Sequence, residues 1–583
     1  MDIESAKSKE GSGYTLEVKD LSYTVNIKKN KEMVSKTIIH PTNFTIIPKK
    51  MLAIMGSSGA GKSTLIDILA TKIPLDNTEG EYLLNDKPLP KSFRRISGYV
   101  MQSDALYPLL TVYETLMYAA QLRVHNKTLQ EKKLMVEETI KVLRLESCAK
   151  TIIGDELRRG VSGGEKRRVS IGVDIIHQPS IIFLDEPTSG LDSTTALQIV
   201  ETLNELCLKN RTVCVTIHQP SSRILETFSR VIFMSKGHVV YNGSIENLEN
   251  YVSSISKADL PHHANLSEIF LEVISGYEQS GDIASLVDKK NENEKHRQDS
   301  ATSLQAHNHF IEEISYANSI FKETLIILNR NAVNFLRTPE LFFIRLTLSV
   351  VVALVMGSLY WNINLNNQDG RLQLLGYASY VVAFYLFTSL EVLPIFLKER
   401  DVFIRENSRG AYRISSFVLA NFLVNVPFII LISIVFIGIS FFMLQLQNAN
   451  GNFIYTILIC FCIMLAGNSF ATFVSGVVPD ALTGNSAGTA LLAFMFLFGG
   501  FFIRTDDIPD GWIWFNYISM FRYPVEGILR SNFEMLDNGE SYYDEFNIED
   551  VERWSIIGIM WVFIVGFRVL FFVTLKLKYG SKH

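Results

Sequence analysis

The sequence is poor in cysteine, and this limits the kinds of site that it can contain. Its 583 residues include only five cysteines: Cys148, Cys207, Cys214, Cys460 and Cys462. Their spacing matches neither a zinc site nor a disulfide framework. The last two lie two residues apart within an apolar stretch, so on a helix they would point to different faces. We therefore expect the cysteines to be packing thiols.

A strong excess of charge of one sign is also missing. The formal net charge is -5 at pH 7, and 20% of the residues are charged. Because nucleic-acid-binding proteins usually carry a basic surface, we expect no nucleic-acid partner. The N-terminus begins Met-Asp-Ile-Glu-Ser and has no basic region followed by an apolar core. We therefore expect no cleaved signal peptide and a cytosolic N-terminal domain.

Apolar residues are distributed unevenly along the chain. Up to about residue 310, charged and apolar residues alternate as in a soluble domain, whereas beyond about residue 340 long apolar blocks follow one another. A membrane-spanning helix needs about 20 apolar residues. Six such blocks in succession argue against the alternative, which is a set of buried helices in a soluble core. The predicted spans lie near residues 341–361, 373–396, 414–444, 452–477, 482–502 and 555–575.

Basic residues predict the orientation of these spans, because cytosolic loops are enriched in lysine and arginine. The segment after the second span carries Lys398, Arg400, Arg405, Arg409 and Arg413. The C-terminal tail carries Lys576, Lys578 and Lys582. Both segments are therefore predicted to be cytosolic. The segment 503–554 is acidic and aromatic, so we predict that it lies on the outer face as short re-entrant helices.

Few ionisable residues lie inside the predicted spans. Glu391 and Arg568 are both near cytosolic ends of their helices. The favoured interpretation of Arg568 is that its side chain snorkels to the membrane surface, and a buried structural or functional pair is the alternative.

A glycine-rich loop is the strongest local signal in the N-terminal half. It follows the strand-like run Met51–Met55 and opens a helical run at Leu65. In such a context, glycines let backbone N–H groups approach phosphates, Lys62 reaches the β- and γ-phosphate oxygens, and Ser63 holds Mg²⁺. The loop consists of Gly56, Ser57, Ser58, Gly59, Ala60, Gly61, Lys62, Ser63 and Thr64. We therefore predict that the chain binds ATP and Mg²⁺.

A pair of carboxylates further along the chain completes this prediction. Ile181–Leu184 is an apolar run suited to a strand that is buried on both faces, and it ends at Asp185 and Glu186. Carboxylates at the end of a buried strand are costly unless they have a role. We predict that Asp185 holds Mg²⁺ and that Glu186 polarises the water that attacks the γ-phosphate. The alternative, an ordinary surface pair, fits badly with four large apolar residues before it.

Three further motifs occur in a specific order: Val161–Glu165, Ser189–Asp192 and Thr216–Pro220. Together with the glycine-rich loop and the acidic pair, they make the chain resemble the ABC transporters over nearly its whole length. The resemblance implies an α/β P-loop ATPase, with a RecA-like core and a helical subdomain, followed by an all-α six-span transmembrane domain.

The resemblance also implies a shared nucleotide site. In that family a short motif, called the signature, clamps the ATP that is held by the phosphate loop of the partner domain. The residues that match the signature here are Ser162, Gly163, Gly164 and Glu165. Asp192 matches the aspartate that contacts the other subunit.

Other positions match residues that act on the nucleotide. Gln102 matches the glutamine that contacts Mg²⁺ and couples the site to the membrane domain, and His218 matches the histidine that senses the γ-phosphate. With Lys62 and Glu186, His218 completes the predicted catalytic set. The chain departs from the family at Val25, where an aromatic side chain usually stacks on adenine. We therefore expect weak adenine stacking and a looser nucleotide preference.

The order of the domains narrows the resemblance to the G subfamily of half-transporters, the White and breast-cancer-resistance type. The implied parts are a tail (1–15), a nucleotide-binding domain (16–274), a flexible linker (275–310) and a transmembrane domain (311–583). Within the last part, 311–335 resembles the connecting helix and the basic segment 398–413 the coupling element.

A single nucleotide-binding domain implies that the chain works with a second half-transporter, either in a homodimer or in a heterodimer. The resemblance implies export of a small apolar or amphipathic substrate, such as a lipid, a sterol or a xenobiotic, from the cytosol or the membrane lipid. The alternatives are an ATP-driven importer, or an ATP-gated channel or regulator that does not pump.

Four phenylalanines are candidates for contact with that substrate. Phe387 aligns with the family's central aromatic residue, and Phe384 lies one turn away. Phe501 and Phe502 align with the apolar pair that plugs the outer end of the cavity. The alternative for each is an ordinary packing or lipid-facing side chain.

Overall fold

The structure is a computed structural model, and it describes residues 13–29, 32–73, 77–90, 93–256, 265–280, 282–295, 316–338, 340–446, 451–534, 536, 541–546, 548 and 552–580. Its contacts divide the chain into two compact units. The first contains the residues up to Ala317 and the short segment Ser408–Ala411, and the second contains Asn318–Asn407 and the residues from Tyr412 onward.

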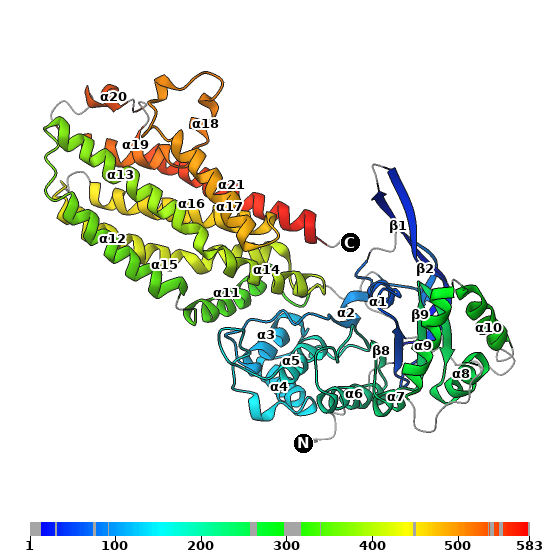
Figure 1. The fold of residues 1–583 in the computed structure, drawn as a ribbon. Helices are drawn as coiled ribbons and strands as arrows, with labels where there is room; N and C mark the ends of the chain where they lie inside the picture. Colours follow the sequence, from blue (N-terminus) through cyan, green and yellow to red (C-terminus); the bar gives the residue numbers. More distant parts are fainter. Residues whose placement is uncertain are drawn as a thin grey trace. The chain divides into compact units, whose positions relative to one another are not determined.

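The first unit is built on two β-sheets (Figure 1). The larger sheet has the order β10-β9-β3-β8-β7-β6, in which all neighbours are parallel except β10 and β9. Its strands are β3 (Leu52–Gly56), β6 (Ser97–Val100), β7 (Ile181–Leu184), β8 (Thr212–Thr216), β9 (Arg230–Ser235) and β10 (His238–Gly243). All residues of β3, β6, β7 and β8 are buried, as expected of parallel strands covered on both faces.

The smaller sheet is antiparallel and has the order β2-β1-β4-β5. Its strands are β1 (Leu16–Lys29), β2 (Glu32–Ile46), β4 (Thr78–Leu84) and β5 (Lys87–Pro88). The helices that accompany the two sheets are α1 (Lys62–Leu69), α2 (Phe93–Ile96), α6 (Ser193–Leu208), α7 (Ser222–Glu226), α8 (Leu248–Ser256) and α9 (Leu266–Ser280).

Three helices form the predicted helical subdomain, and each begins with the same local motif. They are α3 (Val112–Arg123), α4 (Leu129–Val142) and α5 (Gly163–Ile175). Each is preceded by a serine or threonine whose side chain accepts from the backbone of a glutamate three residues on, while that glutamate bonds back to the N-cap backbone. Such a capping box satisfies two N–H groups that a helix start otherwise leaves unpaired.

The predicted linker is partly helical. Helix α9 runs to Ser280, and α10 (Ile283–Lys295) follows it. Leu286 of α10 is fully buried, and Tyr251 donates a hydrogen bond to its backbone carbonyl at 3.4 Å. The prediction of a flexible segment is therefore wrong for Ile283–Lys295, because its few apolar residues are enough to dock it.

The second unit is helical (Figure 1). Five helical segments within the described residues are long and apolar enough to span a membrane: Phe342–Leu359, Gln368–Asn407, Ile414–Met443, Asn452–Val477 and Arg553–Tyr579. The remaining predicted span, 482–502, corresponds to the shorter apolar helix α17 (Ala481–Leu497). This helix ends before Gly499 and Gly500, and Gly500 has a φ of 87° that a helix cannot continue through.

The second unit contains further elements around these spans. Before the first span lies α11 (Ile320–Leu336), which corresponds to the predicted connecting helix, although 311–315 fall outside the described residues. The spans themselves contain α12 (Arg345–Leu359), α13 (Gln368–Thr388), α14 (Leu393–Asn407), α15 (Ile414–Met443), α16 (Asn452–Val477) and α21 (Arg553–Tyr579). The basic segment 398–413, which was predicted to follow the second span, is thus helical up to Asn407 and forms most of α14. Arg330 of α11 makes two bonds to Glu406 of α14, at 2.6 and 3.0 Å.

The described residues of the predicted outer segment include the helices α18 (Ile513–Tyr517), α19 (Arg522–Phe533) and α20 (Ser541–Phe546). Arg522 is fully buried there, and its charge is met by Glu526 at 2.7 Å and by Asn516 Oδ1 at 2.5 Å. The five cysteines are buried and unbridged, as the sequence predicts.

Arg568 of α21 does not snorkel, and in this respect the favoured interpretation is wrong. Its side chain is buried and donates to Ser469 Oγ, Asn421 Oδ1 and Asn468 Oδ1 at 3.2, 2.8 and 2.6 Å. Its guanidinium also lies 5.2 Å from the centre of the Phe422 ring. Among the described residues no carboxylate pairs with Arg568, so neutral amides and a hydroxyl hold this charge.

Candidate functional site

The glycine-rich loop joins β3 to α1 and needs its glycines for steric reasons. Gly56, Gly59 and Gly61 all have positive φ, at 154°, 78° and 99°. A Cβ atom at Gly56 would lie 2.3 Å from the carbonyl oxygen of Met234, so the loop is pressed against the end of β9. Gly61 is the N-cap of α1. The loop therefore presents backbone N–H groups at a helix N-terminus, which is the arrangement that binds phosphate.

Lys62 is buried beneath this loop. Its Nζ donates to the backbone carbonyls of Gly56 and Ser57 at 2.8 and 2.9 Å. Burial lowers the pKa of Lys62, and the nearby carboxylates of Glu186 and Asp185 oppose that shift. Lys62 thus sits between the loop and the acidic pair.

The acidic pair lies directly after β7, as predicted, and is tied to the phosphate loop. Asp185 Oδ1 accepts from Ser63 Oγ at 3.1 Å and from Thr216 Oγ1 at 2.7 Å. Thr216 Oγ1 in turn accepts from the backbone N–H of Glu186 at 2.8 Å. Asp185 is buried, so these bonds compensate for the removal of its charge from water.

Glu186 is held in an unusual backbone conformation. Its φ is 44°, which is uncommon for a residue with a side chain and costs energy. The side chain accepts a hydrogen bond from Gln102 Nε2 at 2.8 Å. Strain of this kind at a carboxylate is typical of functional sites.

The residues present fit a magnesium ion. Mg²⁺ prefers oxygen ligands and is usually bound by one or two carboxylates together with substrate phosphates. Ser63 Oγ and the Asp185 carboxylate already lie together, and Gln102 is joined to the neighbouring Glu186. Within the part of the chain that the structure describes, no cluster of three or more His, Cys, Asp or Glu residues forms a complete metal cage. An ion here would therefore depend on the phosphates of the nucleotide.

Arg167 of α5 connects the separate parts of this site, and the sequence analysis assigned it no role. Its guanidinium donates to the backbone carbonyls of Met101 and Gln102 at 2.6 and 3.1 Å and to Asp104 at 2.8 Å. It also donates to the carbonyls of Asp185, Glu186 and Pro187. A single planar fork thus fixes the Gln102 loop and the acidic pair to the helix that begins with the signature.

The signature residues lie at an exposed helix start, apart from the phosphate loop. Ser162 caps α5 through the capping box with Glu165, and these bonds hold the pKa of Glu165 below its usual value. Gly164 must lack a side chain, because a Cβ atom there would lie 2.3 Å from Thr195 Cγ2. Among the described residues, no hydrogen bond joins Ser162 or Gly163 to the loop that holds Lys62.

Asp192 and His218 also stand apart. Asp192 caps α6 by accepting from Thr195 N at 3.0 Å and from Thr194 Oγ1, and these bonds lower its pKa. His218 follows β8 and is exposed, and its side chain makes no hydrogen bond or ion pair with the other described residues. Val25 lies on β1, opposite Lys36 of β2.

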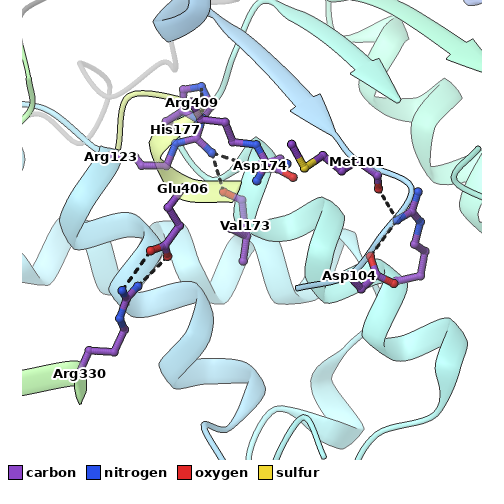
Figure 2. Close-up of polar contacts among 10 residues, drawn as sticks. Met101, Asp104, Arg123, Val173, Asp174, His177, Arg330, Glu406 and Arg409 are labelled. Carbon is purple, nitrogen blue, oxygen red and sulfur yellow. Dashed lines mark hydrogen bonds and ion pairs between the residues drawn. The ribbon is translucent and has the colours of Figure 1, made fainter. Parts of the chain in front are cut away.

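A buried cluster lies at the far end of α5. Asp174 has no exposed surface, and it pairs with Arg123 at 3.3 Å and with Arg409 (Figure 2). Arg123 also lies 3.3 Å from His177 Nε2. Burial, reinforced by the charges of Arg123 and Arg409, keeps the pKa of His177 well below its ordinary value. Arg409 belongs to the short segment Ser408–Ala411 that packs with the first unit.

Comparison with known proteins decides the family. Residues 39–189 match the family model described as "ABC transporter", and residues 322–533 and 218–291 match models described as "ABC-2 type transporter". Among curated proteins, the chain is similar to ABC transporter G family member 20 of Arabidopsis thaliana, at 34% identity over 100% of this chain and 90% of that one. The chain belongs to the ABC transporter G family.

Two further relatives from the same organism agree with this assignment. Member 6 is 36% identical over 91% of this chain and 80% of its own length, and member 17 is 34% identical over 98% and 97%. As a G-family half-transporter, the chain is an ATPase whose hydrolysis of ATP drives transport across a membrane.

Three of the four candidate substrate residues of this G-family chain, Phe387, Phe501 and Phe502, lie in a connected group of aromatic rings. The Phe387 ring centre is 6.3 Å from that of Phe496, which is 6.3 Å from Phe501 and 5.0 Å from Phe502. Phe501 and Phe502 are 39% and 59% exposed, so packing alone does not account for them. The sequence analysis missed Phe496, the ring that joins Phe387 to the other two.

Phe384 belongs to a different neighbourhood. Its ring stacks on that of Tyr380 at 6.4 Å, and the side chain also lines a small cavity with Arg345, Tyr385 and Thr388. Phe384 and Phe387 are both half-buried on α13. Phe384 and Phe387, which lie one turn apart on α13, therefore contact different aromatic rings.

Proposed function

We propose that the chain forms a dimer in which each ATP lies between the phosphate loop of one copy and the signature of the other. The observation that supports this is the division of the site within one chain. Ser63, Asp185, Glu186 and Gln102 are joined by hydrogen bonds, partly through Thr216, and the charge of Lys62 lies close enough to interact with both carboxylates. The helix starts at Ser162 and Asp192 are exposed, and among the described residues no hydrogen bond joins Ser162 or Asp192 to this group. An exposed helix N-terminus with a free glycine face suits the γ-phosphate of a nucleotide held elsewhere.

In this proposal each residue of the bonded group has a separate task. Lys62 binds the β- and γ-phosphate oxygens, and Ser63 with Asp185 and Gln102 holds Mg²⁺, which would stabilise the charge that develops on the phosphates. Glu186 polarises the attacking water. Because Gln102 donates a hydrogen bond to the Glu186 carboxylate, a movement of the Gln102 loop also changes the position of this base. His218 is exposed and able to reach the γ-phosphate when the dimer closes.

We further propose that the transported substrate is an apolar or amphipathic molecule that moves outward. The aromatic group of Phe387, Phe496, Phe501 and Phe502 provides apolar surface without charge. Such surface suits a lipid, a sterol or a flat xenobiotic. The Val25 position leaves the adenine ring without an aromatic partner there, so GTP is expected to compete with ATP more than in a site with such a partner.

Complementation between inactive variants tests the shared site. Lys62→Ala disables the phosphate loop of its own chain, and Ser162→Arg disables the signature. A mixed dimer of these two variants keeps one intact site, made from Lys62 of the second chain and Ser162 of the first. We therefore expect co-expression to restore ATPase activity that each variant lacks alone.

The matched control is a mixture of Lys62→Ala with Glu186→Gln. Both changes affect the half of the site that carries the phosphate loop, so the mixed dimer has no intact site and should stay inactive. Equal activity of the two mixtures, or no recovery in the first although mixed dimers are isolated by two affinity tags, would sink the proposal of a site shared between two copies.

The hydrolytic roles and the direction need separate tests. Glu186→Gln should bind ATP and remain in a closed dimer, whereas Lys62→Ala should fail to bind it productively. Inside-out vesicles should accumulate a fluorescent lipid or sterol analogue only with ATP. Uptake into right-side-out vesicles would favour an importer, and flux down a gradient that survives Glu186→Gln would favour a channel.

A further inference from the structure

The outer side of the phosphate loop is held by a residue that no motif includes. Glu278 lies near the end of α9, and its Oε1 accepts hydrogen bonds from Ser57 Oγ at 3.2 Å and from Ser235 Oγ at 2.6 Å. Ser57 is the second residue of the phosphate loop, and Ser235 is the last residue of β9. One carboxylate oxygen therefore joins α9, β9 and the loop.

The turn that follows β9 strengthens this connection. Lys236 Nζ donates to the backbone carbonyl of Glu278 at 2.9 Å, which holds the end of α9 in place. The backbone N–H of Gly237 donates to the carbonyl of Ala60 in the phosphate loop at 3.0 Å. The loop is thus held at two points, Ser57 and Ala60. The contact at Ala60 is between backbone groups, whereas the contact at Ser57 depends on the Glu278 side chain.

Ser57 connects Glu278 to the lysine that binds phosphate. The side chain of Ser57 is held by Glu278, while its backbone carbonyl accepts a hydrogen bond from Lys62 Nζ at 2.9 Å. Since one residue makes both contacts, a displacement of Ser57 also displaces the acceptor that orients Lys62. A hydrogen bond to a carboxylate is roughly twice as strong as one between neutral groups, so the contact is suited to fixing the loop.

We propose that Glu278 is a positioning residue for ATP, which holds Ser57 and thereby sets the conformation of the loop that receives the phosphates. Glu278 does not itself touch the nucleotide. Its influence falls on the binding of ATP, because the base Glu186 and the Gln102 loop are fixed by a different set of bonds through Arg167 and Thr216. The end of α9 is consequently part of the nucleotide site.

The test is the steady-state ATPase activity of the purified full-length protein as a function of ATP concentration. Glu278→Ala should raise KM for ATP about tenfold, the loss expected for a hydrogen bond to a charged group, and leave kcat within about twofold. Glu278→Gln keeps an acceptor oxygen without the charge, so its KM should return to within about threefold of the original value. Glu272→Ala is the matched control, because Glu272 is exposed on the same helix and its side chain makes no hydrogen bond or ion pair within the described part of the chain.

A double-mutant cycle separates this role from general destabilisation. Ser57→Ala should raise KM by an amount similar to Glu278→Ala, and the double variant should be no worse than the single ones, because both remove the same contact. An unchanged KM in Glu278→Ala, a fall in kcat in its place, or effects that multiply in the double variant would each overturn the proposal. If Glu278→Ala does not fold, the other two variants decide. A raised KM in Ser57→Ala together with a near-normal KM in Glu278→Gln supports the proposal, whereas a normal KM in Ser57→Ala together with a raised KM in Glu278→Gln overturns it.

Discussion

Two buried arginines, Arg167 of the ATPase unit and Arg568 of the membrane unit, have their charges compensated in different ways. Arg167 of the ATPase unit donates to five backbone carbonyls and to the carboxylate of Asp104. Arg568 of the membrane unit has only two amide oxygens, a hydroxyl and an aromatic ring. In the ATPase unit the arginine fastens several loops of the reacting site, whereas in the membrane unit it joins neighbouring helices without a counter-ion.

This contrast reflects what each unit must do. The carbonyls around Arg167 belong to segments with no regular hydrogen-bond partner of their own, so a fork of donors is needed to hold them. Around Arg568 the helices already satisfy their own backbone within the span, so side-chain groups join them there. Replacing each arginine by methionine, which has a similar length and no charge, therefore tests the two arrangements against each other.

The largest effect is expected for Arg167→Met. The change leaves Asp104 and several carbonyls without their donor, and removal of one partner of a buried ion pair costs about 3 to 5 kcal/mol. We expect a lowered melting temperature of the full-length protein and ATPase activity near background. Arg167→Lys should also fail, since an ammonium group cannot reproduce the planar fork. Normal activity in Arg167→Lys would contradict the importance of that geometry.

A smaller effect is expected for Arg568→Met. The change leaves neutral acceptors unpaired, which costs about 1 to 3 kcal/mol for each fully buried one. It also removes a charge that is costly to bury, so the free energy of unfolding should fall by only about 1 to 2 kcal/mol. Melting temperature in detergent and basal ATPase activity are the measurements, and activity should stay within about twofold. If Arg568→Met is as harmful as Arg167→Met, the distinction between the two units is wrong.

The smallest effect concerns pH and the cluster around Asp174. Because burial keeps the pKa of His177 well below its ordinary value of 6.5, the unfolded chain binds a proton there that the folded chain does not. Stability should therefore fall as pH drops through 6.5, by about 0.8 kcal/mol between pH 7.5 and 6.0 for this one group. His177→Asn should flatten that dependence in melting curves across this range, with the exposed His125→Asn as the control. An unchanged slope in His177→Asn would show that other groups cause it.

Much of the ATPase unit could be predicted, because its motifs are local. The phosphate loop, the strand Ile181–Leu184 and the acidic pair after it depend on consecutive residues, and the structure brings Lys62, Ser63 and Asp185 together as expected. The roles given to Ser162, Asp192 and His218 remain predictions. Arg167 and Glu278 could not be assigned in advance, since their partners come from distant segments and no local pattern marks them.

The membrane unit was predictable in outline only. Apolar length located the spans, but it extended the span 482–502 beyond Leu497, where two glycines end the helix. Length and charge also said nothing about which helix faces meet. Arg568 was misjudged for this reason, because its partners Asn421 and Asn468 lie on other helices, and an asparagine in a span carries no sign of what it binds.

The basic residues near the end of α16 have a further consequence. Arg400 donates to the carbonyls of Ser475 and Val478, and Lys578 donates to those of Gly476 and Val477, so both close the C-terminal end of this helix. The same two residues were counted in predicting which side of the membrane their segments occupy. Under the orientation predicted from the sequence, which remains a prediction, each would serve twice: first during insertion as a free charge that retains its segment in the cytosol, and later in the folded protein as a helix cap. A neutral substitution at either position would disturb biogenesis and folded stability together, whereas exchange of lysine and arginine would spare the first and test the second.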